Sequence, residues 1–248
     1  MEEREKRKPK KQKVQKRNKN PITYQNKDVS CKLLAEYLVG RDFSAYGIQL
    51  PKIKDVRPTN LPAVEVNELK IDNLFLLEDD SYVLIDYESR YTEANKQKYL
   101  GYLARLAKKL YNQYRKYVPI RLVIIYTSDV SKGQTKSLLE MGAVRLELTE
   151  VFLVDFNEEE IIHRIEEKLC REEDLGETDL MQLVIYPLMF PGKEAKQDAI
   201  RQVITISGKI ADTTKQKFIL KMLLAFTDKF IGEEDARKIK EGAPVRRL

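Results

Sequence analysis

The sequence predicts an α/β protein in which a central mixed sheet is flanked by helices and followed by a helical C-terminal region. Three observations support this fold class. Residues 68–78 and 82–89 are rich in β-branched and aromatic residues, as strands are. Residues 93–117 have apolar side chains at helical spacing, and the following "VPIRLVIIYT" is a continuous apolar run of strand length. From residue 157 the pattern is helical.

Positive charge is concentrated at the N-terminal end of the chain. Residues 1–20 carry ten lysines and arginines against three glutamates and almost no apolar residue. We therefore expect a disordered basic arm over 1–20, which serves either as a solubilising tail or as a contact for nucleic acid. We expect residues 21–160 to form the core domain and residues 161–248 a helical extension.

The composition excludes several classes of protein. No run approaches the ~18 consecutive apolar residues of a membrane span, so no membrane partner is expected. The N-terminus lacks the apolar segment of a secretory signal. Cys31 and Cys170 are too few for a disulfide framework or a zinc site, which indicates reduced thiols in a cytoplasmic protein.

The first half of the chain predicts a helix, a crossing segment and a hairpin. The helix lies within residues 26–43, and Gly40 is placed to end it. Residues 47–66 should be irregular because they contain three prolines. The strands 68–78 and 82–89 follow, joined by the polar turn Asp79–Ser81.

The second half begins with the helix of residues 93–117. Its predicted buried stripe is Leu100, Leu103, Ala107, Leu110 and Tyr114, and its predicted outer face is Lys98, Arg105, Lys109, Asn112 and Lys116. We read that basic face as solvated, with contact to phosphates as the alternative. Residues 118–127 form a strand, and residues 144–156 form another that breaks near Thr149. The later helices are expected over 157–170, 177–190 with a kink at Pro187, 193–210, 214–230 and 233–241.

Carboxylates on the predicted hairpin are the main functional signal. Alternation along a strand places Val83, Ile85 and Tyr87 on one face and Leu84, Asp86 and Glu88 on the other. With the three-residue loop Asp79–Ser81, Asp72 lies opposite Glu88, whereas a two-residue loop would turn Asp72 to the other face. A loop of three residues needs a left-handed residue near its end, and Asp80 or Ser81 must take that role.

Three converging carboxylates suit a divalent cation, because hard cations take carboxylate oxygens. Such an ion generates hydroxide and stabilises a phosphodiester under attack. The alternative is an exposed hairpin whose acids face water. The lone histidine, His163, has no partner at ligand spacing and is expected on a helix surface. Tyr111 and Tyr114 are expected to pack on the sheet rather than stack on bases.

Asp72, thirteen intervening residues and then "IDYES" resemble the PD-(D/E)XK nuclease motif. Over most of residues 28–245 the chain resembles the recombination-promoting nuclease and putative transposase branch of that superfamily. The resemblance implies a restriction-endonuclease-like fold, so that residues 21–160 would be the nuclease core. It also implies DNA cleavage that depends on Mg²⁺, with Mn²⁺ as a substitute. Asp86 takes the place of the branch's Glu, and Glu88 takes the place of Gln or Lys.

The resemblance implies roles for further residues. Asp72, Asp86 and Glu88 would hold the metal, and Glu36 on the first helix would add a ligand unless it is a solvated side chain. Glu88 stands in the place of the motif's lysine, as it does in some active restriction endonucleases of the superfamily. If a cation is supplied from elsewhere, Lys70 is the first choice, and Arg90 or Lys98 is the alternative.

Three functional hypotheses follow. The first is a magnesium-dependent DNA nuclease that contacts DNA through the basic arm and the active-site face. The second is a nucleic-acid-binding or accessory protein that kept the fold and lost turnover. The third is an interaction scaffold built on the helical C-terminal half, whose mark would be a homodimer that survives deletion of residues 1–20.

Overall fold

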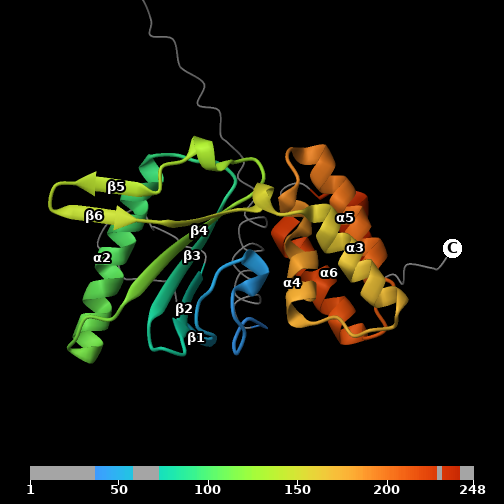
Figure 1. Cartoon of the computed structure of the whole chain (residues 1–248), viewed down its shortest axis with the longest axis horizontal. Coiled ribbons are helices and arrows are strands. Elements are labelled where there is room, and N and C mark those ends of the chain that lie inside the picture. The colour runs from blue at the N-terminus through green and yellow to red at the C-terminus, as the bar shows by residue number, and fades with distance from the viewer. Residues whose placement is uncertain (1–36, 58–72, 228–230, 241–248) are drawn as a thin grey trace, which may run out of the picture.

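A computed structural model describes residues 37–57, 73–227 and 231–240. These residues form three layers: one long helix, a five-stranded mixed sheet and a group of C-terminal helices (Figure 1). This arrangement confirms the predicted α/β class with helices on both sides of a mixed sheet. The predicted basic arm, residues 1–20, lies outside the described residues.

Up to residue 152 the described elements are strands, interrupted by the helix α2 and short 3-10 turns, and afterwards they are helical. The strands are β1 (Ile53–Arg57), β2 (Asn73–Leu77), β3 (Tyr82–Glu88), β4 (Ile120–Tyr126), β5 (Leu138–Met141), β6 (Val144–Glu147) and β7 (Thr149–Phe152). The helices are α2 (Ala94–Tyr114), α3 (Glu158–Cys170), α4 (Glu177–Ile185), α5 (Lys193–Ser207), α6 (Thr213–Thr227) and α7 (Glu233–Lys240).

The main sheet has the strand order β1-β2-β3-β4-β7. β1, β2 and β3 pair antiparallel, whereas β3, β4 and β7 are parallel neighbours. Two parallel strands need a long crossover, and α2 provides it between β3 and β4. The carboxyl ends of β3, β4 and β7 therefore meet at one edge of the sheet.

The hairpin of β2 and β3 has an odd-numbered loop, but one residue earlier than predicted. The Leu77 amide donates to the Ser81 carbonyl at 2.8 Å, so the loop is residues 78–80. Asp80 has φ +60°, which confirms the predicted left-handed residue. The Asp79 carboxylate accepts a hydrogen bond from the Ser81 amide at 3.0 Å, and Ser81 is buried at the start of β3. That local turn fixes the earlier loop.

The strand register consequently differs from the predicted one by two residues. Leu74 lies opposite Leu84, not opposite Asp86, and Leu76 lies opposite Tyr82. An even offset keeps every described side chain on its predicted face. The predicted pairing of Asp72 with Glu88 involves a residue outside the described ranges.

The two faces of the sheet carry separate cores, as alternation in β3 predicted. Val83 and Ile85 pack with the C-terminal helices in one hydrophobic cluster, against which Tyr87 packs. Leu84 packs with α2 in the second cluster. Asp86 and Glu88 share the α2 side, because Lys98 on α2 bonds to both.

The buried face of α2 was predicted only in part, since Leu110 is buried as expected but the other four predicted residues are not. Its buried residues are Lys96, Tyr99, Tyr102, Leu106 and Leu110, while Leu100 and Leu103 are only partly buried against the same cluster. Tyr114, predicted to be buried, is 40% exposed. The predicted stripe left out Tyr99 and Tyr102, whose rings fill the space above the sheet, and their larger area decides which face of α2 turns inward.

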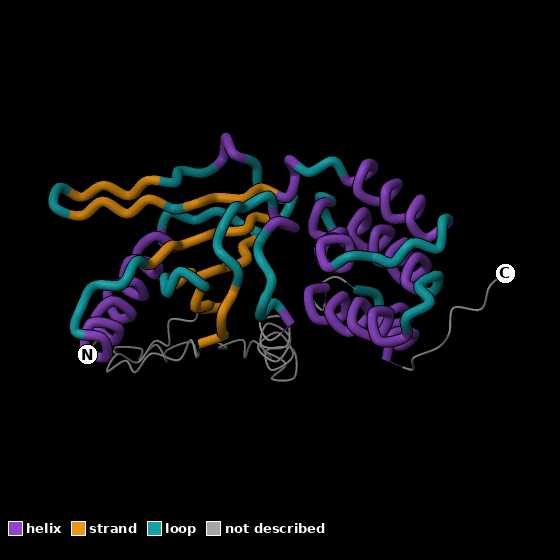
Figure 2. Tube along the Cα trace, turned by 60° about the horizontal axis from the view of Figure 1, so that its bottom comes forward, coloured by secondary structure: helices purple, strands orange, loops and turns teal. Residues whose placement is uncertain are grey.

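Two strands, β1 and β5, were not predicted, and β6 was predicted only as the first part of the strand over 144–156. β1 forms within residues 47–66, which were expected to be irregular, and pairs with β2 as an edge strand. β5 and β6 form a separate two-stranded hairpin that extends beyond α2 (Figure 2). The predicted break near Thr149 is confirmed, since β6 ends at Glu147 and β7 begins at Thr149.

The C-terminal helices follow their predicted positions within a few residues. α4 ends at Ile185, and a 3-10 turn over Tyr186–Met189 begins there with Pro187 near its start, as the predicted kink required. The predicted first helix is described only from Tyr37, and Gly40 has the left-handed φ of +80° of a residue that ends a helix. In the described part of the chain, no helix combines the length and apolarity needed to cross a membrane.

Candidate functional site

The carboxyl end of β3 places two acidic side chains next to each other on the α2 side of the sheet. Asp86 is only 4% exposed, and Glu88 is half-buried at the last position of the strand. They lie two residues apart, so both point to the same face. The parallel neighbour β4 places Ile124 beside Asp86 and Tyr126 beside Glu88. These two acids are the predicted site residues that the structure brings together.

The first turns of α2 hold the hydrogen-bond partners of these acids. Lys98 Nζ donates to Asp86 Oδ2 at 2.6 Å and to Glu88 Oε1 at 3.3 Å. Asn95 Nδ2 and the Tyr99 hydroxyl donate to the same Glu88 oxygen at 3.0 and 3.1 Å. Asn95, Lys98 and Tyr99 are three and four residues apart, and such positions share one side of a helix. One turn of helix thus faces the end of one strand.

Among the residues considered as the cation of the site, Lys98 is the one whose ammonium contacts both acids. Lys70 was the preferred residue and lies outside the described ranges, whereas Lys98 was an alternative that helical spacing had placed on a solvated face. The error in the buried face of α2 explains this ranking. With Tyr99 and Tyr102 turned inward, Lys98 lies at the boundary of the buried face, within reach of β3.

Burial and charge oppose each other at Lys98. Burial lowers the pKa of the ammonium, but the facing carboxylates of Asp86 and Glu88 outweigh burial and hold the pKa above its usual value. Burial, with the same two acids, also raises the pKa of the Tyr99 hydroxyl. Both groups therefore act as hydrogen-bond donors near neutral pH, and the site contains two acids facing a protonated lysine.

A second polar group on the same face was missed from the sequence. Glu150 on β7 lies beside Ile124, so Ile124 separates it from Asp86. The Thr135 hydroxyl donates to Glu150 Oε2 at 3.0 Å, but burial outweighs this bond and raises the pKa of the carboxyl. The sequence "TEVF" did contain a clue to its position. Side chains alternate along a strand, so Glu150 had to share a face with the apolar Phe152, which is buried on the α2 side of the sheet.

The remaining predicted residues divide into two sets. Asp72, Lys70 and Glu36 lie outside the described residues, so their predicted roles stay predictions. His163 is exposed on α3 and lies 3.8 Å from Glu167, as expected for a helix surface. Within residues 37–57, 73–227 and 231–240, no group of three or more histidine, cysteine, aspartate or glutamate side chains could hold a metal ion.

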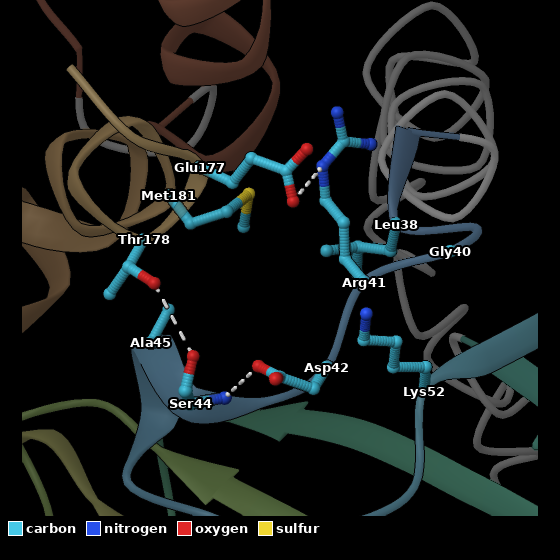
Figure 3. Close-up of a pocket in the computed structure, with 10 residues that line it drawn as sticks. All are labelled: Leu38, Gly40, Arg41, Asp42, Ser44, Ala45, Lys52, Glu177, Thr178 and Met181. Carbon is cyan, nitrogen blue, oxygen red and sulfur yellow. Dashed lines mark hydrogen bonds and ion pairs between the residues drawn. The ribbon is translucent and has the colours of Figure 1, made fainter. Parts of the chain in front are cut away.

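A cavity of about 190 Å³ lies elsewhere, between the segment after Gly40 and the start of α4 (Figure 3). Three of its charged side chains have partners: Arg41 Nε lies 2.9 Å from Glu177 Oε2, and Asp42 accepts a hydrogen bond from the Ser44 amide at 2.9 Å. Leu38 and Met181 in its wall belong to the cluster on the C-terminal side of the sheet. The cavity is therefore separate from the acids, and its contacts tie two segments together.

Comparison with known proteins gives no relative: no protein-family model, no curated protein and no solved structure matches this chain. The geometry of Asp86, Glu88 and Lys98 is therefore the basis for any functional assignment.

Proposed function

We propose that the protein is a DNA nuclease that uses a divalent metal ion, with its site at the carboxyl end of β3. One observation carries the proposal. A buried aspartate and a half-buried glutamate share one strand face, and a lysine from the next helix reaches both at 2.6 and 3.3 Å. Two acids and a lysine are the side chains of the PD-(D/E)XK motif that "IDYES" resembles.

The strand order supports the same proposal. The superfamily's fold is a central mixed sheet with flanking helices, and here an antiparallel hairpin leads through a crossover helix into a parallel strand. The acids lie at the carboxyl end of the middle strand, where open α/β sheets bind their ligands. The restriction-endonuclease-like fold is the finer part of the proposal.

Lys98 would supply the positive charge that the motif's own lysine position lacks in this chain. In the motif the lysine follows the second acid by two positions, where this chain has Glu88. The ammonium of Lys98 comes from the helix and meets the carboxylates of both acids. An ammonium held there stabilises negative charge that develops on a phosphate oxygen, and its fixed position needs no reorganisation during the reaction.

The donor set fits a hard divalent ion in its chemistry, since both described ligands are carboxylates. Asp86 and Glu88 would hold Mg²⁺ or Mn²⁺, with Asp72 and Glu36 as the further predicted ligands. The ion would generate hydroxide from water and stabilise the attacked phosphodiester. Without it, Lys98 neutralises part of the charge on the two acids.

The test is cleavage of supercoiled plasmid with Mg²⁺ or Mn²⁺ by the wild type and by Asp86→Asn, Glu88→Gln and Lys98→Met. We expect each substitution to lower the rate about a hundredfold or more. Asp179→Asn is the matched control, because Asp179 is also 4% exposed and also bonds a lysine, Lys168, at 2.7 Å. Equal cleavage by the wild type and all three site variants would remove the assignment.

The same ion pair favours a second candidate function, nucleic-acid binding without turnover. A lysine that bonds both acids can replace a lost metal as their counter-charge. Calorimetric titration with Mn²⁺ separates the two functions. A nuclease binds Mn²⁺ and loses this binding in Asp86→Asn, whereas a decayed site takes up no ion in either protein while DNA binding persists.

A further inference from the structure

The carboxyl end of α2 and the residues after it form an unusual stretch of surface. Residues 111–117 are all exposed, including Tyr111 and Tyr114 at 40% and Tyr117 at 83%. Seven large hydrophobic side chains are exposed in the described ranges, and three of them lie in this one segment. Tyr111 and Tyr114 were predicted to pack on the sheet, but each leaves 40% of its surface exposed to solvent.

Two of these tyrosines present their rings together. The ring centroids of Tyr111 and Tyr117 are 5.0 Å apart, with 38° between the ring planes. Tyr114 is held differently, since its hydroxyl lies 3.2 Å from that of Tyr82. An exposed pair of aromatic rings offers flat faces on which another planar group can stack.

Within the described residues, the same region carries positive charge that no acidic side chain pairs with. α2 contains no acidic residue. Among the described residues, Lys108, Lys109, Arg115 and Lys116 form no ion pair, and all four are exposed. We call these four cations, together with Tyr111 and Tyr117, the α2 platform.

Two cations on strands of the main sheet, Lys54 on β1 and Arg121 on β4, do have acidic partners. Lys54 pairs with Asp80 at 2.7 Å and Arg121 with Asp79 at 3.3 Å. The lack of acids on the α2 platform is therefore a local property and not a general excess of lysine. Cations at the end of a helix also complement its dipole, but this accounts only for the residues of the last turn and not for the exposed rings.

We propose that the α2 platform binds single-stranded nucleic acid, with phosphates on the cations and bases stacked on Tyr111 and Tyr117. Cations with aromatic faces are the combination that binds single strands without regard to sequence, because every base has a face that can stack. A duplex would use the cations but not the rings, since its bases are already stacked.

The platform is connected to the candidate site by α2 itself. Lys98 and Tyr111 are separated by thirteen residues, or about 20 Å at roughly 1.5 Å per residue. Lys98 and Lys109 lie on the same side of the helix. A strand that leaves the platform along the Lys109 side of α2 would therefore continue toward Asp86 and Glu88. This orientation rests on the proposed function, whereas the binding itself does not.

The experiment is fluorescence anisotropy of a labelled oligothymidine with the full chain in EDTA, so that cleavage does not occur. Tyr117→Ala should weaken binding about tenfold, and Tyr117→Trp should restore it because it keeps the stacking face. Tyr117 is 83% exposed, so neither substitution disturbs the core. The basic arm is present in every variant and contributes equally.

The charges are tested with a matched pair of double variants. Lys108→Gln with Lys116→Gln should reduce the slope of log affinity against log salt by about 1.4, from ~0.7 per phosphate contact on single strands. Lys217→Gln with Lys221→Gln removes two exposed cations from α6 instead and should leave the slope unchanged. Equal slopes for the two double variants, or unchanged affinity of Tyr117→Ala, would overturn the proposal.

Two other occupants of the platform have distinct outcomes, and each would also overturn the proposal. If a duplex binds as tightly as the single strand and Tyr117→Ala weakens neither, the platform reads phosphates only. If sedimentation detects a dimer that Tyr117→Ala dissociates, the platform is a contact between copies of the chain. Failure of the nuclease assignment is separate: in EDTA the wild type should bind the oligonucleotide through the α2 platform whether or not it cleaves plasmid DNA with Mg²⁺.

Discussion

Removal of Lys98 should reveal how strongly the site depends on its counter-charge. In Lys98→Met the Asp86 side chain, 5% exposed, loses an ammonium at 2.6 Å. Breaking a fully buried ion pair costs ~3–5 kcal/mol. Because the Lys98 side chain is 23% exposed and partly hydrated, we expect a smaller loss of unfolding free energy, about 2 kcal/mol.

Metal ions should restore this loss if the two acids bind them. A ligand that binds only the folded state stabilises it by about 2.7 kcal/mol at a hundred times its dissociation constant. In Lys98→Met no ammonium competes for the carboxylates, so Mg²⁺ should stabilise the variant more than the wild type. Asp86→Asn should remove the response in both backgrounds.

The assay is urea denaturation followed by circular dichroism, in EDTA and in millimolar Mg²⁺. Lys168→Met is the control, because Lys168 pairs with the equally buried Asp179 at 2.7 Å, on the helical side of the molecule. Its stability should fall less, since Arg164 also lies 3.5 Å from Asp179, and should not respond to Mg²⁺. An equal response to Mg²⁺ in the two lysine variants would refute the reasoning.

Three further outcomes are expected. Deletion of residues 1–20 should flatten the salt dependence of DNA binding, and an unchanged slope would reject a role for the arm. Hydrogen bonds from Lys196, the Gly192 amide and Thr127 outweigh burial and hold the pKa of Asp129 below its usual value. Their stabilisation is present above the unfolded pKa of ~3.9 and lost as pH falls through the lower folded value; because the Asp129 side chain is 29% exposed, Asp129→Asn should cost about 2 kcal/mol at pH 7 and converge with the wild type in acid unfolding curves. Glu172 has φ +56°, so Glu172→Gly should raise the unfolding free energy by roughly 1 kcal/mol in urea; a loss of stability would count against strain there.

Alternation along β3 could be read from the sequence, whereas distances across the fold could not. The split between Val83 and Ile85 on one side and Asp86 and Glu88 on the other needed only the two-residue period of a strand. The fault was in α2, where Tyr99 was not counted as buried. Without Tyr99 on the buried face, the predicted orientation of α2 about its axis was wrong, and Lys98 was expected on the side away from the acids.

Long-range pairing explains the other differences. The β5–β6 hairpin has a short, partly polar sequence, and its base is fastened by Lys96, whose ammonium donates to the Leu138 carbonyl at 2.9 Å. A lysine that is 1% exposed contradicts its usual preference, so no local rule would have placed it inside. Glu150 was missed for a related reason. It lies in one row with Asp86 only because β4 pairs with both β3 and β7, and no local sequence pattern shows this pairing.

The shared hydrophobic cluster between β3, β4 and the C-terminal helices has a practical consequence for trimming the chain. Val83 and Ile125 from the strands pack in one continuous core with Leu183 of α4 and Ile200 of α5. A fragment that stops at residue 160 would leave that side of the strands bare to water and prone to self-association. We therefore expect the last third of the chain to fold together with the sheet, so that a fragment ending at residue 160 should not be stable on its own.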